Sequence, residues 1–309
     1  PKVCIVNCAR GEIIAEKDLL TALESGKVAG AALDVFASEP LPAESPLRKH
    51  PAITLTPHLG ASTREAQEKC GIEVAEVITG YLLTGEVRNA VNLPYLDAKT
   101  YEEVKPYLTL GEKLGKLLAQ LTPGQVDRIH ITYGGKAQEL PNTDPVTRAV
   151  LLGFLSTASV NDLNNVNVRS IASTLGLSVE EKRSNEPVTF NEWLHVQVFR
   201  NGEKVISAGG TFFGSPDNPR IVRVFSHPTE IVPSGVVLLL NNKDLPGMVG
   251  YLGTLMGRHH VNIASMSLSR DTVGGFALTV LNLDSVPPQE ALQELERDPN
   301  ISNVKVVKL

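Results

Sequence analysis

Three short apolar runs lie in the first 60 residues, and each is followed directly by polar residues. The runs are Val3–Val6, Val28–Val35 and Ile53–Thr56, and a helical pattern of leucines over Lys17–Glu24 separates the first two. Continuous apolar runs are typical of parallel strands that are covered on both faces. Strands that alternate with helices form doubly wound α/β sheets. The sequence therefore predicts part of such a sheet at its N-terminal end.

A long helix is predicted from Ser62 to near Gly85, and Ser62-Thr-Arg-Glu65 at its start fits a capping box. Residues 97–231 then show a different pattern, that of an α+β block. Further helices are predicted over Tyr101–Leu121, Pro145–Leu155 and Val166–Leu175. Strand patterns lie at Ile129–Tyr133, Leu194–Phe199, Val205–Ser207 and Ile221–Phe225. No chemical motif is identified in this block.

The last block alternates strands and helices in a recognisable order. The predicted elements are strand Val236–Leu240, helix Pro246–His259, strands Ile263–Leu268 and Phe276–Leu283, helix Pro288–Arg297 and strand Val304–Val307. This βαββαβ order is ferredoxin-like.

Composition excludes several classes of protein. Lys and Arg number 29 against 34 Asp and Glu, a net charge of -5, which argues against a nucleic-acid-binding protein. No apolar run approaches the ~20 residues that span a bilayer.

Three sparse cysteines provide no disulfide framework, so a reducing compartment such as the cytoplasm is expected. The chain opens on Pro1 directly before a strand, so we interpret it as a C-terminal fragment, and an organelle-targeting segment ahead of it stays an open alternative.

Four residues of interest follow the ends of the three N-terminal strands. Arg10 follows the first, Asp34 ends the second with Glu39 shortly after it, and His58 follows the third. Alone, each has a simpler explanation as an exposed loop residue, a turn-forming acid or a structural histidine. Ligands, however, bind outside the carboxyl ends of parallel strands. An arginine side chain binds carboxylates through its planar guanidinium, and histidine is the usual general acid or base. A neighbouring glutamate favours the protonated form of the histidine. Together, these residues predict an acid–base site.

The segments around these positions resemble a known family. Asn7–Gly11, Gly30–Phe36 with Glu39-Pro40, and Thr56–Ser62 resemble the second-half signatures of the D-isomer-specific 2-hydroxyacid dehydrogenases. Within that family, Pro57–Gln67 and Asn89–Pro94 resemble the D-3-phosphoglycerate dehydrogenases. Leu245–Gly250 and His260–Ala264 resemble an ACT domain, a small regulatory module that often binds amino acids.

The resemblance implies an α/β and α+β multidomain protein. Residues 1–95 would be the C-terminal part of a Rossmann-type NAD-binding domain with its return helix. Residues 96–232 would be an α+β intervening domain similar to allosteric substrate-binding domains, and 236–309 a ferredoxin-like ACT regulatory domain. The family's Gly-x-Gly-x-x-Gly turn and ribose-binding acid do not occur in this sequence. They are expected ahead of Pro1, so the fragment is expected to be inactive alone.

The resemblance also implies a reaction, the NAD-dependent oxidation of 3-phospho-D-glycerate (3-phosphoglycerate) to 3-phosphohydroxypyruvate in L-serine biosynthesis. Arg10 would hold the substrate carboxylate, His58 would exchange the proton, and Glu39 would orient His58. The residues implied to contact NAD are Cys8, Ala9, Arg10, Asp34, His58, Gly60 and Ala61. No metal is expected, and Cys8 is not expected to be a nucleophile.

The resemblance finally implies regulation by L-serine. The serine would bind at the interface of a homo-oligomer that forms through the ACT and intervening domains. The residues implied are Asn242, Asp244, Pro246 and Gly247 of one subunit and Asn262 of the other. The simpler alternatives are that Asp244 caps a helix and that Asn242 is a turn residue.

Two other functions stay open. One is oxidation of another 2-hydroxy acid, such as glycerate, glyoxylate or lactate, although the shorter relatives end near residue 95. The other is a non-catalytic ACT amino-acid sensor, against which the Arg10–Glu39–His58 set argues.

Overall fold

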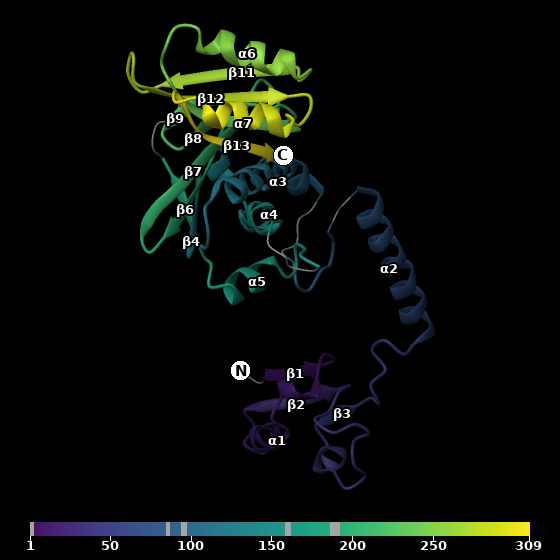
Figure 1. Ribbon diagram of the computed structural model, residues 1–309. Coiled ribbons are helices and arrows are strands. Elements are labelled where there is room, and N and C mark those ends of the chain that lie inside the picture. The colour runs from purple at the N-terminus through teal and green to yellow at the C-terminus, as the bar shows by residue number, and fades with distance from the viewer. Residues whose placement is uncertain (1–2, 85–86, 94–97, 158–161, 186–191) are drawn as a thin grey trace. The chain divides into compact units, whose positions relative to one another are not determined.

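The structure is a computed structural model, and it describes residues 3–84, 87–93, 98–157, 162–185 and 192–309. The chain divides into two compact units, Pro1–Gly85 and Glu86–Leu309, whose elements are labelled in Figure 1. Within the described ranges, no helix is long and apolar enough to cross a membrane.

The first unit contains a three-stranded parallel sheet. Its strands are β1 (Val3–Asn7), β2 (Val28–Leu33) and β3 (Ile53–Leu55), in the order β1-β2-β3. Helix α1 (Glu16–Glu24) and the 3-10 turn η2 (Pro46–Lys49) contribute leucines to a core with β2. The predicted α/β pattern is therefore confirmed.

The register of this sheet aligns the ends of its strands. Asn7 lies opposite Leu33, and Leu33 lies opposite Leu55. All three strands run in the same direction, so their carboxyl ends meet at one edge. The segments that follow them, which begin at Cys8, Asp34 and Thr56, therefore start side by side.

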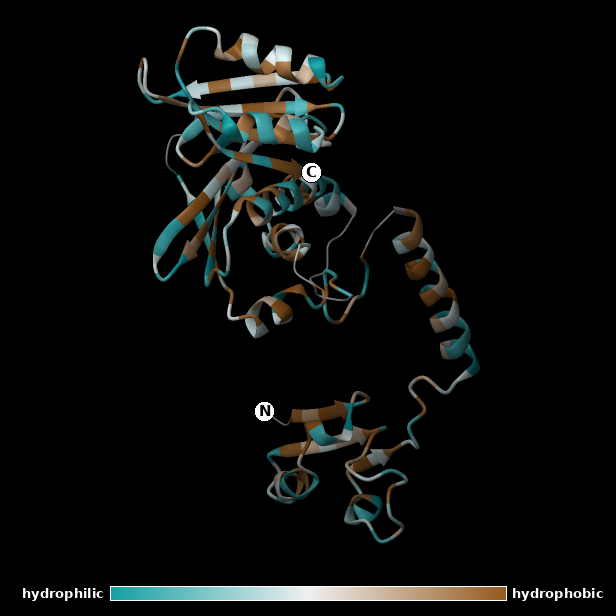
Figure 2. Ribbon diagram, viewed as in Figure 1, coloured by the Kyte–Doolittle hydropathy of each residue, from teal (hydrophilic) through white to brown (hydrophobic). Residues whose placement is uncertain are grey.

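Helix α2 (Arg64–Thr84) follows β3 and begins one residue later than a Ser62 cap would place it. The Ala66 N–H donates to Thr63 Oγ1 at 3.2 Å, whereas the Ser62 hydroxyl donates to the carbonyl of His58 at 3.4 Å. The predicted capping box is therefore wrong, because Thr63 provides the cap. Figure 2 shows that α2 becomes more hydrophobic toward its C-terminal end, where Leu82 is 75% exposed.

The second unit contains a six-stranded sheet in the order β5-β4-β6-β7-β8-β9. Its strands are β4 (Arg128–Gly135), β5 (Ser178–Ser184), β6 (Glu192–Arg200), β7 (Glu203–Phe212), β8 (Pro219–Val224) and β9 (His227–Ile231). The helices of this part are α3 (Ala98–Leu121), α4 (Asp144–Leu155) and α5 (Val168–Thr174), with a 3-10 turn η3 (Lys136–Glu139). Leucines of α3 and isoleucines of β4 form one buried core.

Two glycines let α3 and α4 approach each other closely. A Cβ on Gly115 would lie 2.1 Å from the carbonyl oxygen of Val150, and a Cβ on Gly153 would lie 2.0 Å from that of Glu112. Real Cβ atoms do not come this near to backbone, so the helix pair depends on glycine at both positions.

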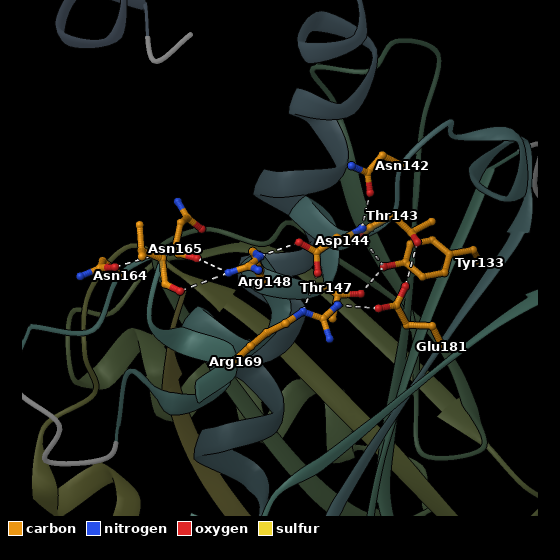
Figure 3. Close-up of polar contacts among 11 residues, drawn as sticks. Tyr133, Asn142, Thr143, Asp144, Thr147, Arg148, Asn164, Asn165, Arg169 and Glu181 are labelled. Atoms are coloured by element: carbon orange, nitrogen blue, oxygen red, sulfur yellow. Dashed lines mark hydrogen bonds and ion pairs between the residues drawn. The ribbon is translucent and has the colours of Figure 1, made fainter. Parts of the chain in front are cut away.

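A network of charged side chains joins α4, α5 and β5 (Figure 3). Asp144 pairs with Arg148 Nε at 2.6 Å and with Arg169 Nε at 2.5 Å. Glu181 accepts from Arg169 Nη2 at 2.7 Å and from the Thr143 hydroxyl at 2.8 Å. These contacts hold the short helix α5 and the edge strand β5 against the start of α4.

A four-stranded antiparallel sheet completes the second unit, in the order β11-β12-β10-β13. Its elements are β10 (Val236–Lys243), α6 (Met248–Arg258), β11 (Ile263–Arg270), β12 (Phe276–Leu283), α7 (Gln289–Arg297) and β13 (Ile301–Lys308). The predicted βαββαβ order is confirmed, and α6 and α7 pack on one face.

The other face of this sheet is also buried, which the sequence did not predict. Val237, Leu239, Leu278, Val280 and Val307 belong to the same core as α3 and β4. The predicted domain limits, 1–95, 96–232 and 236–309, stay predictions, and the shared core joins the last two segments into one compact unit.

We expect Gly153→Ala to destabilise the second unit by about 1–3 kcal/mol, because its methyl group overpacks the α3–α4 contact. The matched control is Gly253→Ala in α6, where a Cβ would meet nothing within 4 Å. That change is expected to be neutral or to stabilise by about 0.5–1 kcal/mol. Denaturant unfolding followed by the fluorescence of Trp193, the one tryptophan of the chain, measures both. Equal midpoints for Gly153→Ala and the parent chain would contradict the close contact.

Candidate active site

The loop after β1 is shaped by the buried side chain of Asn7. Its Nδ2 donates to the carbonyl of Arg10 at 2.9 Å, and its Oδ1 accepts from the Ala9 N–H at 3.1 Å. Gly11 closes this loop, because a Cβ there would lie 2.0 Å from the carbonyl carbon of Phe36. The loop is thus pressed against the exit of β2 while Cys8, Ala9 and Arg10 stay exposed.

The carboxylate of Asp34 joins the end of β2 to the loop after β3. Its Oδ1 accepts from the Thr56 hydroxyl at 2.5 Å and from the Leu59 N–H at 2.8 Å, and its Oδ2 accepts from the Gly60 N–H at 2.9 Å. Asp34 is only 5% exposed. The Thr56 hydrogen bond, followed by the backbone N–H groups, lowers the pKa of Asp34 below its ordinary value. Both oxygens are therefore engaged within the protein.

Those hydrogen bonds shape the turn that carries His58. This residue has a φ of 56°, in the left-handed region that non-glycine residues rarely adopt. Its Nδ1 lies 2.7 Å from Glu39 Oε2, and Glu39 Oε1 accepts from the Phe36 N–H at 3.0 Å. The hydrogen bond with His58, then that with Phe36, and the charge of Arg10 lower the pKa of Glu39. Glu39 is thus kept as a carboxylate that occupies one ring nitrogen and leaves Nε2 to act.

The histidine–glutamate pair borders a cavity of about 590 Å³, whose lining also includes Phe36, Leu55 and Thr56. Arg48 and Leu41 also line the cavity, and Arg48 donates to the carbonyl of Leu41 at 2.7 Å. The cavity presents a general acid–base group beside an apolar wall. This arrangement suits a small polar substrate that must lose a proton.

Arg10 is close to the pair, although it does not line this cavity. Its Nη1 donates to the carbonyl of Ala9 at 2.7 Å, and its charge acts on Glu39. Of the three residues expected to be catalytic, the structure thus brings Glu39 and His58 into direct contact and places Arg10 within electrostatic range.

Small exposed residues surround the same sheet edge, and they fit a dinucleotide. Cys8, Ala9, Gly60 and Ala61 are all exposed there. A Cβ on Gly60 would lie 3.3 Å from Asp34 Oδ2, so glycine lets this loop stay close to β2. These residues could hold the nicotinamide end of NAD against the strand ends, as expected from the sequence.

The structural roles of Asn7, Thr56 and Arg48 were missed by the sequence reasoning. Asn7 is the last residue of β1 and Thr56 directly follows β3, and polar residues at such positions are the available signal. Arg48 had no signal, because its partners are main-chain carbonyls.

Comparisons with known proteins match all three parts of the chain. Residues 1–60 match the model of the D-isomer specific 2-hydroxyacid dehydrogenase NAD binding domain. Residues 103–225 match the D-3-phosphoglycerate dehydrogenase intervening domain, and residues 236–300 match the ACT domain.

Individual relatives agree over the whole chain. The D-3-phosphoglycerate dehydrogenase of Synechocystis sp. is 39% identical over 310 residues, which are 100% of this chain and 55% of that protein. Those of Archaeoglobus fulgidus and Bacillus subtilis are 38% and 35% identical, each over 99% of this chain and 58% of the relative. The chain is thus similar to D-3-phosphoglycerate dehydrogenases over its whole length. It spans a little more than half the length of these relatives.

Two of the expected effector residues have partners inside the segment that matches the ACT domain. Asn242 is 1% exposed, accepts from the Thr279 hydroxyl at 2.7 Å and donates to the carbonyl of Lys243 at 2.8 Å. Asn262 Nδ2 donates to Asp284 Oδ2 at 2.7 Å. Asn242 thus sits within the sheet, whereas Asn262 stays at the surface.

Asp244 is held by the hairpin between β11 and β12. It accepts from the Gly274 N–H and from Arg270 Nη1, both at 3.0 Å. The Gly274 N–H, and then Arg270, lower the pKa of Asp244. The alternative that Asp244 caps α6 is wrong, because the cap residue is Gly247, with a φ of 91°, and no side chain caps this helix. Pro246 and Gly247 form the turn before α6, as expected.

We expect Asp34→Asn to loosen the His58 turn, because an amide presents one acceptor oxygen where the carboxylate presents two. The depressed pKa of Asp34 means that its stabilisation is complete above the ordinary value of 3.8 and is lost as the pH falls below it. Asp34→Asn removes this acid-dependent contribution. Hydrogen–deuterium exchange should show faster exchange at Leu59 and Gly60.

The control for this change is Asp18→Asn on the exposed face of α1, which should leave exchange at both amides unchanged. If Asp34→Asn also left their exchange unchanged at neutral pH, the carboxylate would not be what holds the turn.

Proposed function

We propose that the protein to which this sequence belongs oxidises 3-phospho-D-glycerate to 3-phosphohydroxypyruvate with NAD, in the biosynthesis of L-serine. The observation that carries this proposal is the 2.7 Å contact between His58 and Glu39 at the carboxyl edge of the NAD-binding sheet. The relatives that match the whole chain are named D-3-phosphoglycerate dehydrogenases, which supports the choice of substrate over other 2-hydroxy acids.

In the proposed reaction, NAD supplies the acceptor for a hydride from the substrate carbon that bears the hydroxyl. His58 Nε2 takes the hydroxyl proton, since Nδ1 is held by Glu39. The Glu39 carboxylate keeps the ring oriented and stabilises the positive charge that the ring gains. Arg10 binds the substrate carboxylate through its planar guanidinium, once it leaves the carbonyl of Ala9.

The assembly that we propose is a homo-oligomer formed through the ACT and intervening domains, with L-serine as its effector. Asp244 would pair with the ammonium group of L-serine, and the Pro246–Gly247 turn would bind its carboxylate. Asn262 of a neighbouring subunit would form hydrogen bonds with both charged groups. The three cysteines are exposed and free, which supports a reducing compartment such as the cytoplasm.

Turnover of 3-phosphoglycerate by the longer protein tests the proposed function. With NAD present, we expect 3-phosphoglycerate to be oxidised in preference to D-glycerate, as followed by NADH absorbance. His58→Ala should lower kcat by about 10²–10⁴-fold, the usual contribution of a positioned acid–base group. The control is His50→Ala, because His50 is the other histidine of the first unit and its Nδ1 accepts from the main-chain N–H of Ala52. Preference for D-glycerate, or normal kcat in His58→Ala, would refute the assignment.

The effector assignment is tested by ligand-linked stability of the whole chain. L-serine at millimolar concentration should raise the Tm, because a ligand that binds only the folded state stabilises it. D-serine is the control ligand, and Asp244→Asn should abolish the shift by removing the ammonium partner. If sedimentation shows a dimer but L-serine leaves its Tm unchanged, the effector assignment is wrong and the ACT domain serves only in oligomerisation.

A further inference from the structure

A second cavity lies within the Glu86–Leu309 unit. It has a volume of about 400 Å³ and is lined by the end of α3, by β7, by the turn between β8 and β9, and by the four-stranded sheet. We call it the α3–β13 cleft. Buried Ile206, Leu239 and Leu278 are among its lining residues. None of the expected catalytic, cofactor or effector residues lines it.

The α3–β13 cleft contains polar side chains that have no partner. The side chains of Asn241, Asn303 and Lys305 make no hydrogen bond or ion pair with any described residue, although all three residues line the cleft. Lys305 lies directly opposite Leu239 in the sheet, and Asn241 lies opposite Leu278. Lys305 is the one charged residue among the described residues that line the cleft. An anionic group therefore has a cation and two amides to bind, with no carboxylate to repel it.

The backbone at two lining residues is strained. Asn303 has a φ of 54° beside an irregularity in the pairing of β10 with β13, and Phe225 has a φ of 55°. A bulky residue in the left-handed region is costly, and such strain concentrates at functional sites. Bulges likewise redirect side chains next to binding sites. Phe225 lines the cleft and is 43% exposed as a whole residue.

One wall of the cleft is fixed in place before any ligand binds. Gln120, at the end of α3, donates to the carbonyl of Lys308 and accepts from its N–H, both at 3.0 Å. These two hydrogen bonds hold α3 against β13, because the side-chain amide of Gln120 pairs with the main chain of Lys308 as a neighbouring strand would. A preorganised wall of this kind lowers the entropic cost of binding a ligand.

We propose that the α3–β13 cleft binds a small aromatic carboxylate. Lys305, Asn241 and Asn303 bind the carboxylate, and the ring packs between Phe225 and the apolar residues Leu239 and Leu278. The cavity volume is within the range of small-molecule sites, and its apolar lining with a few polar groups is the usual composition of such sites. Because the cleft is built from both sheets, its ligand would bind the intervening and ACT parts together.

Titration of the whole chain with 4-fluorobenzoate, followed by ¹⁹F NMR, tests this proposal. We expect saturable binding, and binding at least tenfold weaker for the uncharged match 4-fluorobenzamide. Lys305→Gln should raise the Kd about tenfold, the loss of one charge-assisted hydrogen bond. The matched control is Lys308→Gln on the same strand, whose side chain alternates to the other face and whose main chain makes the Gln120 contact. It should leave the Kd unchanged.

A second variant separates binding from folding. Phe225→Gly relieves the positive φ, so the chain should stay folded by Trp193 fluorescence while 4-fluorobenzoate binds several-fold more weakly. Three results would overturn the proposal: no saturation at millimolar 4-fluorobenzoate, equal affinity for the amide, or an unchanged Kd in Lys305→Gln.

Discussion

The carboxylate of Asp34 is the interaction on which the candidate active site depends. A buried carboxylate is tolerated only when donors surround it, and here the Thr56 hydroxyl and the N–H groups of Leu59 and Gly60 supply three. Because these donors all come from the segment after β3, their hydrogen bonds fix the path of that segment against the end of β2. His58, between them, is placed by this constraint.

The same strand exit positions the second carboxylate. Glu39 is bound by the Phe36 N–H, two residues after Asp34, and it holds His58 through Nδ1. The two acids differ in exposure and in role: Asp34 is enclosed and shapes the loop, whereas Glu39 is partly exposed and faces the cavity. Their different roles follow from the parallel sheet, which brings the carboxyl ends of β2 and β3 to one edge.

The sequence predicts the parts of this structure where side-chain pattern and backbone agree. Apolar runs identified the strands of the three-stranded sheet and those of the βαββαβ block. The two strands that were missed, β5 and β9, are the edges of the six-stranded sheet. β5 reads Ser-Val-Glu-Glu-Lys-Arg-Ser and β9 contains Pro228, and charges and proline are what edge strands carry to prevent further pairing.

The candidate site was predicted to a similar degree. Strand-end position was enough to select Arg10, Glu39 and His58, but not the structural role of Asp34. That role depends on main-chain donors aligned by a left-handed turn at His58, and no residue type in Thr56–Gly60 signals such a turn. Asp34 is expected to contact NAD, and it also holds the loop after β3 through three hydrogen bonds. Both roles are compatible only if the cofactor binds beside the carboxylate and leaves those three hydrogen bonds intact. The main constraint on cofactor position at this edge is therefore the hydrogen bonding that already holds the turn at His58.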